Sequence, residues 1–319
     1  MEAKRRTATV CSLVGKLSSV SEQIRLDALR ELRLMTKQDE ESRPLIAEAG
    51  AIPYLAETLY ASSHDSQENA AAALLNLSIS CKESIMSIRG VLDAISHLLS
   101  HHGSTSSATA VQSSAATLHS LLVVDEYRPI IGSKRDIVYA LVDIIKSHKS
   151  PPRSIKDSLK ALFGIALYPL NRSTMINLGA IPPLFSMILK DGRLGIVEDV
   201  TAVIAQIAGC EESDEAFRKV SGIGVLVDLL DLATGSSMRT KENAVSGLLN
   251  LVRCGGEKVA MDVRVRAMGA LDGVTDVAEN GSAKGKSRAV ALMKVLLDGG
   301  SNGNISSDSR FDSSLNQAS

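Results

Sequence analysis

A pair of leucine-like residues, three positions apart, recurs along the chain at a nearly constant interval. The phrase NAAAALLNLS at 69–78 contains one copy, and NAVSGLLNLV at 243–252 contains another. The seven pairs are Leu29/Leu32, Leu74/Leu77, Leu118/Leu121, Leu162/Ile165, Ile204/Ile207, Leu248/Leu251 and Leu292/Val295. Successive pairs are 45, 44, 44, 42, 44 and 44 residues apart. A period of this length indicates stacked structural repeats, because one repeat cannot bury its own apolar face.

A second phrase lies between successive pairs and often carries a glycine. Its clearest copies are EAGAIPYLAETL at 48–59 and NLGAIPPLFSMIL at 177–189. A glycine at this point favours the end of one helix and the start of the next, since glycine readily adopts positive φ. We expect such turns at Gly50, Gly90, Gly179, Gly222 and Gly269. Each unit is therefore predicted to contain a short helix, a turn, an amphipathic helix, a loop and a longer apolar helix.

Three helices in about 44 residues are typical of armadillo repeats, and two-helix HEAT units are the nearest alternative. The sequence thus predicts an all-α fold, a right-handed armadillo-repeat solenoid of about six to seven repeats, over residues 20–298. Residues 1–19 are expected to form an N-terminal capping helix. The last copy, 283–298, is expected to be a third helix alone. The Ser-, Gly- and Asn-rich segment 299–319 is predicted to be disordered.

Composition restricts the classes of function. Apolar residues make up 45% of the chain and its formal net charge is −1, so no general positive field favours nucleic acid or an anionic membrane surface. The four cysteines are widely separated, which predicts neither a zinc site nor a disulfide framework. No stretch is apolar for long enough to be a membrane span, and none resembles a cleaved signal peptide. We therefore expect a protein of the cytoplasm, the nucleus or both.

Several phrases carry a resemblance to a known family. RPLIAEAGAIPYLAETL, ENAAAALLNLSIS, LVVDEYRPIIGS and NLGAIPPLFSMILKDG, in this order, are similar to the armadillo-repeat region of plant U-box ubiquitin ligases. In that family a U-box precedes the repeats and recruits the ubiquitin-charged conjugating enzyme, and its CPI-like and DPV-like motifs do not occur in this sequence. The resemblance implies a non-catalytic protein-interaction scaffold in a plant signalling or ubiquitin-linked setting. The alternative is a U-box ligase component or fragment that binds substrates for ubiquitination.

The third helices are expected to line a concave groove, with the residue before each second anchor facing it. The polar candidates at these positions are Asn76, Ser120, Gln206 and Asn250. Armadillo import receptors pair Trp with Asn at such positions, and because this chain contains no Trp, a nuclear-import receptor is not expected. We predict instead that these side chains help to hold an extended partner polypeptide through many modest contacts.

One repeat carries a stripe of basic residues. Arg153, Lys156 and Lys160 fall at i, i+3 and i+7, which places them on one face of a helix. The two following repeats carry an acidic and a basic pair, Glu198/Asp199 and Arg239/Lys241. We predict that the basic stripe, Arg153–Lys156–Lys160, receives an acidic or phosphorylated segment of a partner. The alternative is a solvated helix face.

No motif in the sequence predicts catalysis. Asp93, His97 and His101 share a helix face and could hold a divalent metal, but water-exposed histidines near a helix C-terminus are the simpler interpretation. NGSAKGKS at 280–287 lacks the first glycine of a phosphate-binding loop and follows no strand. We expect no enzymatic activity, no metal, no cofactor and no small-molecule substrate.

Overall fold

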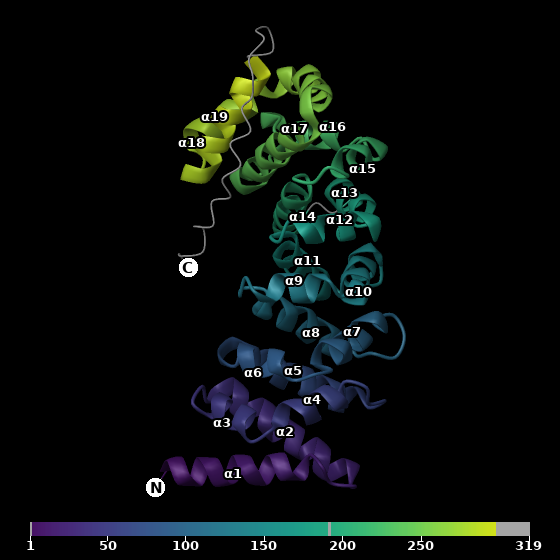
Figure 1. Cartoon of the computed structure of the whole chain (residues 1–319), viewed down its shortest axis with the longest axis vertical. Coiled ribbons are helices and arrows are strands. Elements are labelled where there is room, and N and C mark those ends of the chain that lie inside the picture. The colour runs from purple at the N-terminus through teal and green to yellow at the C-terminus, as the bar shows by residue number, and fades with distance from the viewer. Residues whose placement is uncertain (1, 191–192, 298–319) are drawn as a thin grey trace.

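The computed structural model describes residues 2–190 and 193–297, and within these ranges the chain forms helices and no strands. The helices stack from one end of an elongated molecule to the other (Figure 1). The predicted all-α solenoid is therefore confirmed. No helix in the described ranges is long and apolar enough to cross a bilayer. The segment 299–319, predicted to be disordered, lies outside the described residues.

The helices follow the predicted three-helix order. The first helices include α3 (Ser42–Glu48), α6 (Lys82–Ser87), α9 (Tyr127–Gly132), α12 (Leu170–Asn177) and α15 (Ser213–Lys219). The second helices are α4 (Ala51–Thr58), α7 (Val91–Ser100), α10 (Arg135–Lys146), α13 (Ile181–Lys190), α16 (Gly222–Asp228) and α18 (Leu271–Asn280). The third helices are α2 (Glu22–Gln38), α5 (His64–Ser80), α8 (Ala108–Leu121), α11 (Pro152–Ala166), α14 (Leu194–Ile207), the first part of α17 (Met238–Ala267) and α19 (Ala283–Leu297). The 3₁₀ turns η1 (Leu232–Thr234) and η2 (Met268–Ala270) lie before and after α17.

The third helices form the core of the stack. Each one packs against the next, from α2 at one end to α19 at the other. Every anchor residue identified from the sequence is buried except Val295, which is half-buried. Burying one leucine side chain contributes roughly 1.5–3 kcal/mol, so the anchors at each interface hold neighbouring units together. The predicted register of the apolar pairs is therefore confirmed.

The helix α1 (Glu2–Lys16) covers one end of the stack. Val10, Leu13, Val14 and Leu17 follow the i, i+3, i+4, i+7 spacing of one helix face, and all four are buried. The helix contacts α2 and α3. Its other face is mostly polar and exposed. Since a terminal repeat needs a polar outer face, this arrangement suits the capping role expected for residues 1–19.

Glycines with positive φ separate first and second helices where the sequence predicts them in three units. Gly50, Gly90 and Gly179 have φ of 82°, 86° and 80°. The conformation lets the chain leave one helix and enter the next within two or three residues. The predicted turn at Gly269 is wrong, because this residue lies within η2 and has no positive φ.

The predicted turn at Gly222 is also wrong. Ser221 adopts the left-handed conformation, at φ 55°, and Gly222 is the first residue of α16. Gly222 serves packing instead, since a Cβ at this position would lie 2.7 Å from Cζ of Phe185. Sequence alone identifies a glycine at the junction but does not distinguish a glycine needed for its φ from one needed for space.

The helix α17 belongs to two units because a glycine interrupts it. Gly256 has φ 65° and ψ −160°, which is outside the helical region. The part before Gly256 is the third helix of one unit, and residues 257–267 are the first helix of the next. This second part is joined to α19, because the Arg264 guanidinium donates to the backbone oxygen of Val295, and α18 and α19 pack together to complete the last unit. The expectation that residues 283–298 form a third helix alone is therefore wrong, because the predicted break was placed at Gly269 and not at Gly256.

Candidate functional site

Side chains of successive third helices form a continuous surface along the length of the stack, and we call it the third-helix surface. Its members lie between first and second helices, as α5 lies between α6 and α4 in Figure 1. The predicted polar residues on this surface are all half-buried, namely Asn76, Ser120, Gln206 and Asn250. The structure therefore spaces them one or more units apart along a common surface.

Two of these asparagines join neighbouring third helices. Asn76 on α5 donates from Nδ2 to Oγ1 of Thr36, at 3.1 Å, and Thr36 lies on α2. Asn250 on α17 donates from Nδ2 to the backbone oxygen of Ala205 on α14, at 2.9 Å. Both residues occupy the same position relative to their anchor leucines. The repeated asparagine thus stabilises the contact between units, and its predicted role in binding a partner stays a prediction.

Ser120 makes the same kind of contact. Its Oγ donates to the backbone oxygen of Ser78 on α5, at 2.9 Å. Asn243, which sequence reasoning did not single out, donates from Nδ2 to Oγ1 of Thr201 on α14, at 3.1 Å. Its position at the start of the phrase NAVSGLLNLV was the available signal, since Asn69 begins the matching phrase. These side chains form a polar seam along the third-helix surface.

Gln206 differs from the other polar candidates. It lies on α14 and is half-buried, and its side-chain amide makes no hydrogen bond with any residue in the described part of the chain. An amide offers both a donor and an acceptor. The amide of Gln206 therefore differs from the amides of Asn76 and Asn250, which bond to a neighbouring unit.

The structure keeps Arg153, Lys156 and Lys160 on one face of α11, as predicted. Arg153 and Lys156 are exposed, whereas Lys160 is half-buried and its Nζ lies 3.6 Å from Oδ1 of Asp157. Asp157 also accepts a hydrogen bond from Nε2 of Gln112 on α8, at 3.2 Å. The basic stripe is therefore partly neutralised at Lys160 and open at Arg153 and Lys156.

Asp199 on α14 faces the same charges. Burial raises the pKa of its carboxyl, and Lys156, Lys160 and Arg239 act in the opposite direction. Its Oδ2 is buried and makes no hydrogen bond to the described residues. Basic and acidic side chains of α11, α14 and α17 therefore alternate across three neighbouring units. Lys241 does not belong to this row, because it is buried and its Nζ lies 2.7 Å from Oδ2 of Asp276 on α18.

The three possible metal ligands on and just after α7, Asp93, His97 and His101, do not form one group. Asp93 forms an ion pair with Lys134, which lies just before α10. The ring centroids of His97 and His101 lie 4.3 Å apart with the ring planes tilted by 41°, and the ring centroid of Tyr60 lies 4.7 Å from that of His97. No group of three or more metal-ligating side chains occurs among the described residues. The two histidines and Tyr60 therefore form a small aromatic cluster at the C-terminal ends of two second helices, α4 and α7.

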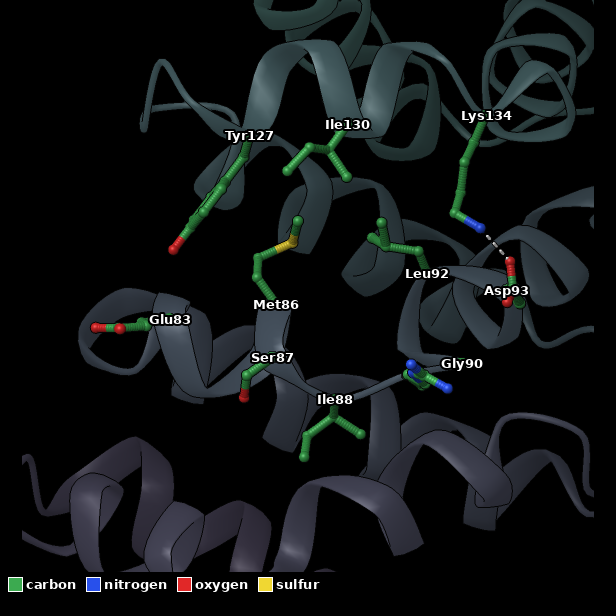
Figure 2. Close-up of a pocket in the computed structure, with 11 residues that line it drawn as sticks. Glu83, Met86, Ser87, Ile88, Gly90, Leu92, Asp93, Tyr127, Ile130 and Lys134 are labelled. Atoms are coloured by element: carbon green, nitrogen blue, oxygen red, sulfur yellow. Dashed lines mark hydrogen bonds and ion pairs between the residues drawn. The ribbon is translucent and has the colours of Figure 1, made fainter.

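A hollow of about 640 Å³ lies between neighbouring units, and sequence reasoning missed it. Figure 2 shows Met86 reaching toward Tyr127 and Ile130, with the Lys134–Asp93 ion pair on one side. Glu83 and Arg89 also line this space. The sequence did contain a signal for this hollow. Short first helices contain two adjacent apolar residues, and because only one of the two side chains can point into the core, the other is left to line the space between units. The hollow combines an apolar floor with a charged rim.

The sequence profile of the plant U-box protein ARM repeat region matches residues 9–313. The chain belongs to this family. U-box domain-containing protein 17 of Arabidopsis thaliana is 33% identical over 291 residues, which are 91% of this chain and 38% of the relative. U-box domain-containing protein 18 of the same plant is 26% identical over 286 residues, or 89% of this chain and 40% of the relative. This chain thus spans about two fifths of the length of these relatives.

Solved structures of armadillo proteins have the same fold. A β-catenin structure from work on its phosphorylation-controlled interaction with cadherin matches with a TM-score of 0.73 and 18% identity, over 91% of this chain and 53% of that chain. A designed armadillo repeat protein matches with a TM-score of 0.51 and 20% identity, over 90% and 99% of the two chains. Identities this low support the fold alone. The predicted armadillo solenoid and the suspected family are both confirmed.

Proposed function

We propose that this chain is a non-catalytic scaffold that binds partner polypeptides along the third-helix surface. The observation that carries the proposal is the unbroken succession of third helices, each packed on the next and each offering half-exposed polar or charged side chains. An extended rigid surface suits a polypeptide ligand, because many modest contacts add along it without ordering the surface first. Solved relatives of the fold include a designed armadillo protein in complex with the peptide (KR)4, with a TM-score of 0.50 and 19% identity, and β-catenin, which interacts with cadherin.

Within this surface, Arg153 and Lys156 are the residues proposed to receive an acidic or phosphorylated segment. Both are exposed and lie one turn apart, so their charges can act on one anionic group. Lys160 contributes less, because Asp157 already lies beside it. Gln206 is proposed to bind the partner backbone, whereas Asn76, Ser120 and Asn250 would act mainly by holding the surface together and secondarily by contacting the partner.

A second candidate function is the substrate-binding part of a ubiquitin ligase. Matching relatives are named U-box domain-containing proteins, and this chain corresponds to about two fifths of their length. The same surface would then bind the substrate, while a U-box would recruit the conjugating enzyme. A plant setting, and a location in the cytoplasm or nucleus, belong to the same proposal. A ubiquitination assay with a full-length U-box relative and its substrate separates the two candidates. An excess of this chain should compete for the substrate and reduce its conjugation if the chain is a substrate-binding part, whereas a scaffold for other partners should leave conjugation unchanged.

Binding itself is tested by selecting random displayed peptides against the purified chain and measuring the affinity of the selected peptides. Arg153→Glu/Lys156→Glu should reduce the affinity of acidic peptides by about tenfold or more, because two charge-assisted contacts become repulsive. Lys146→Glu is the matched control, since Lys146 is exposed at the end of a second helix, α10. If substitutions on third helices leave every selected peptide unaffected while Lys146→Glu weakens binding, the proposal is wrong.

A further inference from the structure

Three basic side chains gather at the C-terminal end of the third-helix surface. Lys284 and Arg288 lie one turn apart on α19, and Arg253 lies on the part of α17 that precedes its break. The two helices pack against each other, as their neighbouring positions in Figure 1 illustrate. Arg288 donates from Nη1 to Oγ of Ser246 on α17, at 2.7 Å. The half-buried guanidinium of Arg288 therefore lies against α17, and α17 is also the helix that carries Arg253.

This basic cluster, Arg253–Lys284–Arg288, has more charge than its surroundings neutralise. No carboxylate lies within ion-pair distance of these three side chains among the described residues. Glu242 is the acidic residue that acts on Arg288. Its two oxygens accept hydrogen bonds from the backbone N–H and the Oγ of Ser282 at the start of α19. Glu242 is thus already engaged, and it also occupies the helix N-terminus that could otherwise bind an anion.

The electrostatic cost of the cluster shows in its own groups. Burial lowers the pKa of Arg288, and the charge of Arg253 lowers it further. Burial likewise lowers the pKa of Lys284, and the charge of Arg288 adds to the effect. Like charges one turn apart disfavour each other in the folded chain. The repulsion therefore lowers the stability of the folded chain, and a bound anion would remove it.

We propose that Arg253, Lys284 and Arg288 bind the phosphate group of a phosphoserine or phosphothreonine in a partner protein. Three cations and one carboxylate leave a net charge of +2, which a phosphate monoester with a charge of about −1.5 to −2 neutralises. A carboxylate carries a single negative charge and would leave half of the excess positive charge without a counter-charge. Guanidinium groups also match phosphate oxygens in a two-pronged geometry. The inference rests on the proposal that the chain binds polypeptides, and it places a site outside the basic stripe of α11.

The test is an NMR titration of the full chain with N-acetyl-phosphoserine methylamide, followed at the Nε–Hε signals of Arg253 and Arg288. A saturable shift of both signals is expected, with no shift for N-acetylserine methylamide. Arg253→Gln/Lys284→Gln should weaken binding by about a hundredfold or more, because each of the two lost charge-assisted contacts accounts for about tenfold or more. Both substituted residues are exposed, so the variant keeps the buried contact of Arg288 with Ser246.

Lys286→Gln/Lys294→Gln is the matched control, because both lysines are exposed on α19 and the loss of charge is the same. It should bind the probe as the unchanged chain does. Equal weakening by both variants would mean general charge attraction and would overturn the site. Equal shifts from N-acetyl-aspartate methylamide would overturn the preference for phosphate. Failure of the probe to bind would overturn this phosphate site. It would not decide whether polypeptides bind at Arg153 and Lys156, because the peptide selection tests that proposal separately.

Discussion

Asn250 on α17 and Ala205 on α14 lie 45 residues apart in the chain and are joined by a 2.9 Å hydrogen bond from the Asn250 amide to the Ala205 carbonyl. The bond crosses from one unit to the next, and Asn76 makes a corresponding bond to Thr36 at the other end of the stack. A polar side chain written into an apolar phrase thus connects consecutive repeats. Asparagine at this position therefore stabilises the solenoid by linking consecutive repeats, and this role needs no ligand.

Replacing Asn250 by alanine should lower the free energy of unfolding by about 1 kcal/mol, the net value of one such hydrogen bond. Urea unfolding followed by circular dichroism measures the change. Gln206→Ala is the control on the same surface, since its side chain forms no hydrogen bond in the described part of the chain, and it should change stability by less than about 0.5 kcal/mol. Equal effects of the two substitutions would contradict the structural role of Asn250.

Replacing Ser221 by glycine should stabilise the chain by about 0.5–1 kcal/mol. Ser221 is exposed and has a φ of 55°, where a Cβ is disfavoured and glycine is not. Thermal unfolding of the two proteins measures the difference. Ser133→Gly serves as the control, because Ser133 is also exposed but has a φ of −73°, so glycine there should give no stabilisation.

Replacing Gly273 by alanine should destabilise the chain by about 1–3 kcal/mol or more. A Cβ at this position would lie 1.8 Å from the backbone oxygen of Leu230, and backbone atoms cannot move aside as a flexible side chain can. The same substitution at Gly15 should have the opposite sign, a gain of about 0.5–1 kcal/mol, since alanine favours helix more than glycine does. Gly15 lies within α1 and nothing lies within 4 Å of its Cβ position. Chemical unfolding of both variants decides the prediction, and two changes of one sign would refute it.

The stability of the chain should fall as the pH drops below about 6.5, in part through His119. Burial lowers the pKa of this imidazole, and the charge of Lys160 adds to the effect. Below the unfolded pKa the unfolded chain binds a proton that the folded chain resists, so protonation favours unfolding and stability rises with pH across this window. His119→Gln should reduce the slope of stability against pH between pH 5 and 7 in urea titrations. A slope that His119→Gln leaves unchanged would contradict this role of the half-buried imidazole.

Part of the candidate site could be read from the sequence. The register of third helices places Arg153, Lys156 and Lys160 on one face, because residues at i, i+3 and i+7 share a face in any α-helix. The environment of each charge could not be read in the same way. Lys241 was grouped with Arg239 by its position, yet it pairs with Asp276 of another helix. The basic cluster of Arg253, Lys284 and Arg288 was missed for the same reason, since its members come from different helices.

The amino-acid sequence by itself determined the unit, its three helices and the buried anchors, because burial of an apolar face is encoded in local spacing. It also determined the family. Only the tertiary structure decided which side chains meet across units: the bond of Asn250 to Ala205, the engagement of Glu242 by Ser282 and the break at Gly256. Contacts of this kind depend on the rotation and shift of each unit against the next. A change of a few ångströms in that packing replaces one polar partner by another while leaving the apolar periodicity intact.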